Sequence, residues 1–290
     1  MPSAPVARFE WLTARGPILL DRPRIAGVLN VTPDSFWDGG RHSALDAAIA
    51  HAGRMIEDGA DLLDIGGEST RPGAQPITRA EEQSRVMPVV RELARRFPAV
   101  HVSVDTVKAD VAREALDEGA AIINDVSGLR LDPALGGVVA DAGAGLILMH
   151  SRGTVDRMAS YDLAEYGPDP VADVVDELSG ALMRAAAAGV AEESIVLDPG
   201  LGFSKRTEHS VAVLAHLDRI LALGHPVLVG PSRKRFVGEL AGGLPPAERL
   251  EGTVAACVAA LFKGARLFRV HDVAAVRRAL DVAEAIRTAS

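Results

Sequence analysis

Eight short apolar segments recur along the chain, and a longer segment with helical periodicity follows each of them. The apolar segments have about five or six residues, the length of strands that are buried on both faces of a parallel sheet. They read IAGVLN, DLLDIG, VHVSVD, AAIIND, GLILMH, SIVLDP, PVLVG and ARLFRV. This repetition predicts an α/β fold built on eight parallel strands.

Amphipathic patterns fill the intervals, as in SALDAAIAHAGRMIEDG, PVADVVDELSGALMRAAAAGV and the C-terminal DVAAVRRALDVAEAIR. Several end in glycine, which favours the left-handed conformation that stops a helix; these are Gly59, Gly119, Gly189, Gly224 and Gly264. Eight strand–helix units in an even rhythm favour a (β/α)8 TIM barrel. A doubly wound open sheet is the alternative that periodicity alone leaves open.

No linker or run of like charge divides the 290 residues. We therefore expect a single barrel domain over residues 24–290. Residues 1–23 precede the first predicted strand, and we expect them to form an N-terminal extension, such as a short hairpin that covers the bottom of the barrel.

Composition narrows the class of protein. The formal net charge is −8, so no general basic surface is available for nucleic acid. No apolar run approaches the roughly 20 residues that span a bilayer, and charges interrupt the N-terminal segment where a signal peptide would be apolar. Cys257 is the only cysteine and lies in an apolar segment, which predicts a buried core thiol. We expect a soluble, cytoplasmic protein.

Polar residues stand at the carboxyl end of every predicted strand, where TIM barrels carry their active sites. They are Asn30, Asp64, Asp105, Asn124, His150, Asp198, Ser232 and His271. Helix capping is the simpler explanation for any single position. For the set it is less adequate, and Asp105, Asn124 and Asp198 together could bind a flat heterocycle that carries N–H donors.

Two basic segments follow the last two predicted strands, which is where TIM barrels often bind phosphate. They are Ser232–Lys234 and Arg269–His271. A surface ion pair would explain Arg269 alone, but the combination of Arg269, His271 and the facing basic segment favours an anion site.

Two long loops, VTPDSFWDGGRH and GESTRPGAQPIT, combine Gly and Pro with Thr, Ser, Arg and acids. Such loops serve as lids over substrate or as plain surface connections. The sequence contains no phosphate-cradling glycine motif, no paired-cysteine or H-E-x-x-H zinc motif and no nucleophile elbow.

Eight ordered motifs resemble those of the dihydropteroate synthases: NVTPDSFWDGG, DIGGESTRPG, SVDT, INDVSG, MH, DPGLGFSK, GPSRKRF and RVHD. The resemblance runs from about residue 24 to residue 285. It implies a TIM barrel that condenses 6-hydroxymethyl-7,8-dihydropterin diphosphate with p-aminobenzoate, with Mg²⁺ assisting, to give 7,8-dihydropteroate and diphosphate.

The resemblance also implies roles for individual residues. The pterin site would comprise Asp105, Asn124, Met149, Asp198 and Lys234. The diphosphate would contact Asn30, Arg269 and His271, with Asn30 also nearest the Mg²⁺. The p-aminobenzoate pocket would comprise Phe36, Thr70, Arg71, Pro72, Phe203, Ser232 and Lys234. Asp38, Asp105, Asp198 and Lys234 would take part in catalysis.

Two alternatives remain at this point: a low-activity or non-catalytic pterin-binding paralogue, and a pterin-dependent methyltransferase. The intact loop residues Asp38 and Arg71 argue against the first, and the anion segments argue against the second. The family implies a homodimer formed through barrel helices and a pocket that sulfonamides, as mimics of p-aminobenzoate, would enter. Trp37 is unusual, because smaller residues are common at its position in the family.

Overall fold

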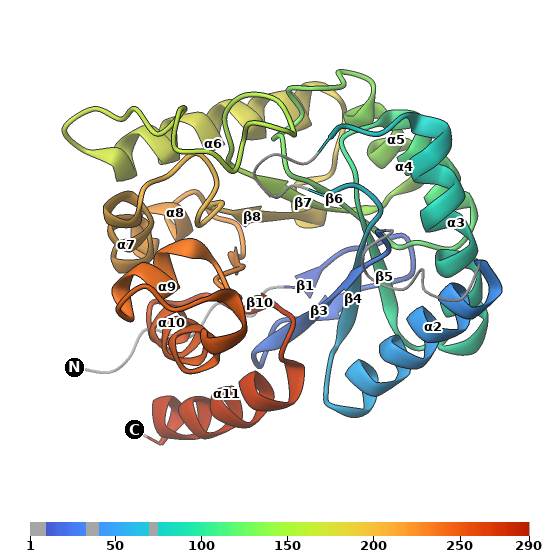
Figure 1. Cartoon of the computed structure of the whole chain (residues 1–290). Coiled ribbons are helices and arrows are strands. Elements are labelled where there is room, and N and C mark those ends of the chain that lie inside the picture. The colour runs from blue at the N-terminus through green and yellow to red at the C-terminus, as the bar shows by residue number, and fades with distance from the viewer. Residues whose placement is uncertain (1–9, 33–40, 70–74, 290) are drawn as a thin grey trace.

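A ring of parallel strands surrounded by helices forms the body of the protein, in a computed structural model that describes residues 10–32, 41–69 and 75–289 (Figure 1). The strands are β3 (Arg24–Asn30), β4 (Leu62–Gly66), β5 (His101–Asp105), β6 (Ile122–Asp125), β7 (Gly145–Met149), β8 (Ile195–Asp198), β9 (Leu228–Val229) and β10 (Leu267–Val270). They pair side by side in the order β8-β7-β6-β5-β4-β3-β10-β9.

The ring closes between β8 and the residues that lead into β9. Leu197 and Val227 form a parallel bridge, and the Leu197 amide donates to the Pro226 carbonyl at 2.9 Å. Pro226 has no amide hydrogen to donate, which agrees with a β9 that is shorter than the apolar segment PVLVG. The predicted TIM barrel is confirmed, and the open sheet is not formed.

Helices cover the outer face of the ring: α2 (Arg41–Glu57), α3 (Arg79–Arg96), α4 (Ala109–Asp117), α5 (Leu135–Ala142), α6 (Pro170–Ala187), α7 (Thr207–Ala215), α8 (Leu217–Leu221), α9 (Arg235–Leu240), α10 (Leu250–Phe262) and α11 (Val273–Thr288). The five glycines predicted to stop helices all have positive φ angles. Two helices rather than one follow both β8 and β9. No helix in the described part of the chain has the length and apolarity needed to cross a membrane.

Strand residues alternate between two separate apolar layers. Outward residues such as Ile25, Leu63 and Val104 join the large core between strands and helices, which also contains the buried Cys257. Inward residues form a second core inside the ring, made of Trp11, Ile18, Leu20, Ala26, Leu62, Ala121, Ile122, Ile147, Val196, Leu228 and Leu267. This alternation is the period-two geometry of a strand.

The N-terminal residues of this inner core come from a hairpin of β1 (Glu10–Trp11) and β2 (Ile18–Leu19), which pair antiparallel. Trp11 is fully buried, and its Nε1 donates to the carbonyl of Ser194, directly before β8, at 2.8 Å. The hairpin therefore covers the amino end of the barrel, as the sequence predicted.

Replacing Trp11 by Ala tests this closure. The change removes a buried indole and leaves the Ser194 carbonyl without its donor, so we expect the free energy of unfolding to fall by about 3–5 kcal/mol. Urea denaturation measures it. Leu19→Ala on the same hairpin is the control, because Leu19 is 46% exposed. Equal losses in the two variants would contradict a sealing role for Trp11.

Candidate active site

A polar layer lies directly above the apolar inner core, toward the carboxyl ends of the strands. Side chains two residues apart in a strand point to the same face, so the residue two positions after an apolar inward residue also points inward. The step from Leu62 leads to Asp64, from Ile122 to Asn124 and from Val196 to Asp198. The same step from Ile147 leads to Met149 and from Leu267 to Arg269. Five strands thus direct functional side chains into one barrel mouth.

Asp64 lies at the centre of this layer. One carboxylate oxygen accepts from Ser103 Oγ at 2.7 Å, and the other accepts from Asn124 Nδ2 at 3.0 Å. Because these bonds orient the amide of Asn124, its Oδ1 is left as a buried acceptor with no partner among the described residues. A buried acceptor of this kind is suited to a ligand that brings an N–H donor.

Arg269 crosses the mouth from β10 and contacts two acids. Its Nη2 donates to Asp198 Oδ2 at 2.8 Å, and its Nη1 lies 3.8 Å from Asp64 Oδ2. The same Nη2 is 3.8 Å from Met149 Sδ. The other oxygen of Asp198 accepts from the Gly200 amide at 2.7 Å. Arg269 therefore does not form the surface ion pair considered from the sequence, because its acidic partners lie inside the barrel.

The buried charges shift one another's protonation. Burial raises the pKa of Asp64, and burial together with the Asp64 charge raises the pKa of Asp105 well above its usual range; Arg269 opposes both shifts. Burial and then Arg269 lower the pKa of Lys234 to about 7, against the attraction of Asp198 and Asp105. A charged ligand in the barrel mouth would therefore change the pKa values of Asp64, Asp105 and Lys234.

An apolar wall stands beside the polar layer. It is formed by Val107, Val126, Met149, Met158 and Phe203. Lys234 Nζ lies 3.6 Å from the centre of the Phe203 ring, a cation–π contact. A polar floor with an apolar side suits a flat ring that has polar edges.

The two basic segments meet at the end of β9 and β10. Ser232 Oγ lies 2.9 Å from His271 Nδ1 and accepts from the His271 amide at 3.1 Å. Either side chain of the Ser232–His271 pair can be the donor, depending on the tautomer of the ring. Arg233 forms a two-pronged ion pair with Asp272, so its guanidinium is already paired within the protein.

Asn30 ends β3 opposite Gly66. A Cβ on Gly66 would lie 3.7 Å from Asn30 Oδ1 and 3.9 Å from Asp105 Oδ2, so both oxygens border the same space. No cluster of three or more His, Cys, Asp or Glu suited to a metal occurs among the described residues. An amide oxygen suits Mg²⁺, which usually keeps several waters and takes further oxygens from substrate phosphates.

Five residues assigned from the sequence lie outside the described ranges. They are Phe36, Asp38, Thr70, Arg71 and Pro72, together with the unusual Trp37. The base of the second loop is described: Glu68 accepts from the Ile77 amide at 2.9 Å and pairs with Lys108 at 2.7 Å. The bond between Glu68 and Ile77 joins the two ends of that loop.

Sequence reasoning gave no ligand role to three residues that organise the site: Asp64, Ser103 and Lys205. Asp64 was recognised only as a polar strand end, although its place two residues after Leu62 predicts an inward side chain. Lys205 is 1% exposed, and its Nζ lies 2.7 Å from His150 Nδ1. Its buried position follows from a loop turn that strand periodicity does not predict.

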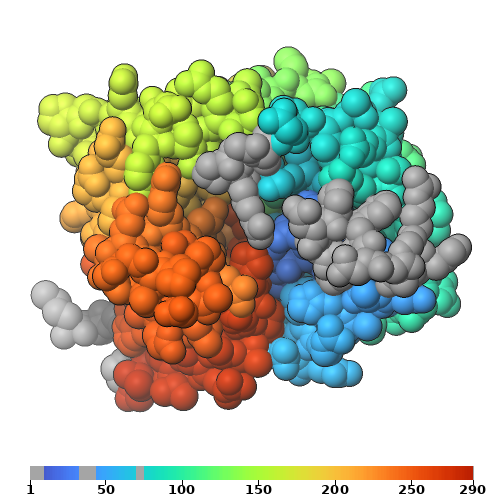
Figure 2. All heavy atoms as spheres, viewed as in Figure 1, coloured from blue at the N-terminus to red at the C-terminus, as the bar shows by residue number. Residues whose placement is uncertain are grey.

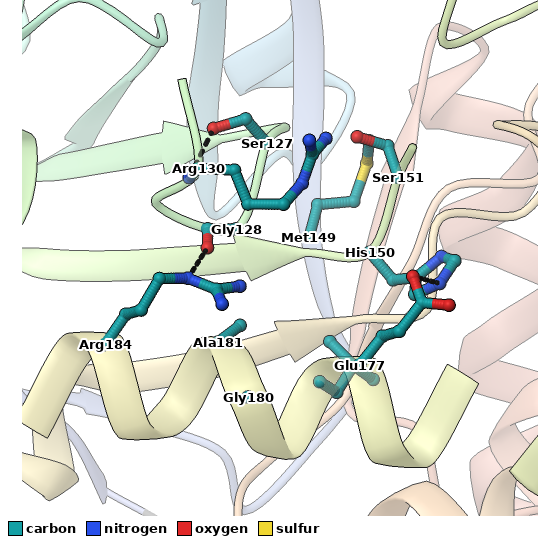
Figure 3. Close-up of a pocket in the computed structure, with 11 residues that line it drawn as sticks. Ser127, Gly128, Arg130, Met149, His150, Ser151, Glu177, Gly180, Ala181 and Arg184 are labelled. Atoms are coloured by element: carbon teal, nitrogen blue, oxygen red, sulfur yellow. Dashed lines mark hydrogen bonds and ion pairs between the residues drawn. The ribbon is translucent and has the colours of Figure 1, made fainter. Parts of the chain in front are cut away.

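The mouth opens on the face shown in Figure 2, which is hollowed near its centre between the orange α9 segment and the blue and cyan segments. A separate cavity of about 150 Å³ lies between β7 and α6. Figure 3 shows Arg130, His150, Glu177 and Arg184 around it. Of the predicted site residues that the structure describes, Met149 alone also lines this outer cavity.

Known proteins match this chain over nearly its whole length. The family model described as pterin binding enzyme matches residues 26–271. The dihydropteroate synthase of Bacillus subtilis is 43% identical over 266 residues, which cover 92% of this chain and 89% of that protein.

Solved structures agree with the sequence matches. The Xanthomonas albilineans dihydropteroate synthase with 4-aminobenzoic acid superposes with a TM-score of 0.87 at 47% identity, covering 94% of this chain and 96% of that chain. The same enzyme in complex with 7,8-dihydropteroate gives a TM-score of 0.83 at 44% identity, with the same coverage. The chain therefore belongs to the dihydropteroate synthase family of pterin-binding enzymes.

Proposed function

We propose that the barrel mouth joins 6-hydroxymethyl-7,8-dihydropterin diphosphate to p-aminobenzoate, with release of diphosphate and formation of 7,8-dihydropteroate. The observation that carries this proposal is the inward polar layer of Asp64, Asn124, Asp198 and Arg269 beside the apolar wall of Met149 and Phe203. Membership of the synthase family supports it.

The pterin ring would lie on the polar layer. Its N–H donors would meet Asp105, Asp198 and the unpartnered Oδ1 of Asn124, and Met149 would pack against one face. Lys234, whose ammonium is held beside Phe203, would donate to an acceptor on the ring. When the ring binds, Arg269 would either lose its hydrogen bond to Asp198 or share the Asp198 carboxylate with the ring.

Bond cleavage would then precede attack by the amine. Loss of diphosphate leaves a cation that is delocalised over the pterin, and the carboxylates of Asp198 and Asp105 would stabilise it. The positive ring would draw Asp105 toward its charged form by opposing the shift in its pKa. Arg269 and His271 would hold the leaving anion. This dissociative, SN1-like route needs no activated nucleophile on the enzyme.

Mg²⁺ would neutralise charge on the departing diphosphate. Asn30 is the residue that would hold it, because its amide oxygen borders the same space as Asp105, with diphosphate and water completing the coordination. The acceptor would bind against Phe203, Ser232 and Lys234, and we infer from the family motifs that Phe36, Asp38, Thr70, Arg71 and Pro72 complete that pocket.

We also infer an organisation around this site. Residues 24–290 would form the catalytic domain and residues 1–23 an extension that stabilises it. A homodimer would form through α10 and α11, which expose Phe262, Val282 and Ile286. A cytoplasmic location stays a prediction.

Asp198→Asn tests the role of the carboxylate. The amide keeps the shape but loses the negative charge opposite both Arg269 and the forming cation, so we expect kcat to fall by about 10²–10³-fold. Formation of dihydropteroate measures it. Asp141→Asn, at an exposed position of α5, is the control. Near-normal turnover by the Asp198 variant would remove this residue from the mechanism.

Arg269→Ala tests the guanidinium in two ways. Diphosphate should bind at least tenfold more weakly, since a charge-assisted pair is lost; titration calorimetry measures it. Removing the charge that opposes the raised pKa values of Asp64 and Asp105 lets them rise further. The folded state then binds protons that the unfolded state has released, so the stability loss should grow as the pH rises above the ordinary pKa range of a carboxyl group.

Exposed Arg278 on α11 provides the matched control, Arg278→Ala. Unaltered diphosphate affinity in the Arg269 variant would move the anion site elsewhere. If the stability loss of the Arg269 variant does not change with pH, the Arg269 charge does not affect the pKa values of Asp64 and Asp105.

Asn30→Ala tests the metal contact. We expect the Mg²⁺ concentration for half-maximal activity to rise about tenfold, while saturating Mg²⁺ restores much of the turnover. A Mg²⁺ titration of both proteins after chelation measures this. An unchanged midpoint would show that Asn30 does not contact the ion.

A further inference from the structure

Lys205 is a buried cation that the reaction described above does not use. Its Nζ lies 2.7 Å from His150 Nδ1, 3.2 Å from the Gly200 carbonyl and 3.2 Å from the Phe203 carbonyl. Two of these three partners belong to the loop that follows β8. That loop also carries Phe203, whose ring contacts Lys234.

The hydrogen bonds require three hydrogens on Nζ. His150 Nε2 faces Glu177 Oε2 at 3.1 Å (Figure 3). Although burial opposes it, hydrogen bonds from His150 and Arg152 lower the pKa of Glu177 to about 2, so Glu177 is a carboxylate acceptor. Burial and Lys205 lower the pKa of His150 to about 4, so the ring is neutral.

Since the neutral ring donates through Nε2, its Nδ1 can only accept. Nζ therefore faces three acceptors: this nitrogen and two carbonyls. Burial lowers the pKa of Lys205 to about 7, against the attraction of Asp198 and Glu177. The three acceptors favour the charged form, because only an ammonium has a hydrogen for each of them. The Lys205–His150–Glu177 chain thus connects the loop after β8 to helix α6, with Glu177 at the wall of the outer cavity (Figure 3).

The loop needs such a support because its backbone is unusual. Gly200, Gly202 and Ser204 have φ angles of 65°, 77° and 48°, and for the serine this region is unfavourable. A Cβ on Gly200 would lie 1.9 Å from the His150 carbonyl oxygen. The chain turns sharply against the end of β7, and this turn directs the carbonyls of Gly200 and Phe203 to the ammonium.

We propose that Lys205 is a positioning residue that fixes Phe203, and through it Lys234, at the p-aminobenzoate side of the site. This inference rests on the proposed function for the identity of the acceptor. Asp198 depends less on Lys205, because its carbonyl accepts from the His150 amide at 2.9 Å within the barrel and its side chain pairs with Arg269.

Lys205→Met tests the proposal in the full-length enzyme. Methionine fills the space of the lysine stem but gives no hydrogen to the three acceptors. We expect the KM for p-aminobenzoate to rise about tenfold or more, because small displacements of positioning groups are costly. The KM for the pterin diphosphate should change less than about threefold. Exposed Lys263 at the end of α10 gives the matched control, Lys263→Met.

Substitution of Glu177 provides a second test. Its side chain is 39% exposed, so we expect the enzyme to fold when this residue is changed. Glu177→Leu removes the acceptor that holds the hydrogen on His150 Nε2, so Nδ1 could become protonated and oppose Lys205. We expect a smaller rise in the same KM. Glu177→Gln keeps an acceptor oxygen and should reverse most of that rise.

Nitrogen NMR of the His150 ring supplies a readout that needs no catalysis: we expect hydrogen on Nε2 in the native enzyme and a redistribution toward Nδ1 in Glu177→Leu. A Lys205→Met enzyme with unchanged p-aminobenzoate KM, or with both KM values raised equally, would overturn the proposal. Native enzyme that forms no dihydropteroate would instead contradict the proposed function, and the two failures are distinguishable.

Discussion

The ion pair between Arg269 and Asp198 is the interaction on which the barrel mouth depends. Three acids, Asp64, Asp105 and Asp198, converge on the barrel mouth, and one guanidinium lies among them. Separating such a pair costs more than the pair gains by forming, because the remaining charge stays buried. The arrangement is therefore poised for a ligand that supplies positive charge on one side and negative charge on the other.

That requirement fits a substrate which becomes a cation and an anion during the reaction. A forming pterin cation would face the acids, while diphosphate would face Arg269 and His271. The same residues that balance one another's charge would then stabilise both products of bond cleavage. In this account, catalysis exploits an existing electrostatic balance and requires few new contacts.

The apolar core that stabilises the barrel and the polar layer of the site lie at different depths along the strands. The lower half of the barrel is an apolar core closed by Trp11, and two residues higher along the strands the inward side chains become polar. In our proposal, loops above that layer add the acceptor side, and Lys205 positions the loop after β8. Change in one layer can therefore occur with limited effect on the others.

Much of this could be predicted from the sequence, since period-two alternation and glycine stops are local properties. The eight strands, the hairpin and the meeting of Asp105 with Asn124 followed from them or from the family motifs. The pairing of Arg269 with Asp198 could not be predicted, because it depends on distances across the ring. Lys205 is buried by a turn with left-handed residues, which no periodicity reveals. Phe36, Asp38 and Thr70 to Pro72 remain predictions.

A crystal structure with the pterin diphosphate tests the central claim most directly. We predict the ring against Asp105, Asn124 and Asp198, with Met149 on its face and the diphosphate between Arg269 and His271. A ring bound in the outer cavity beside Arg130 and Arg184, or a diphosphate remote from Arg269, would contradict it.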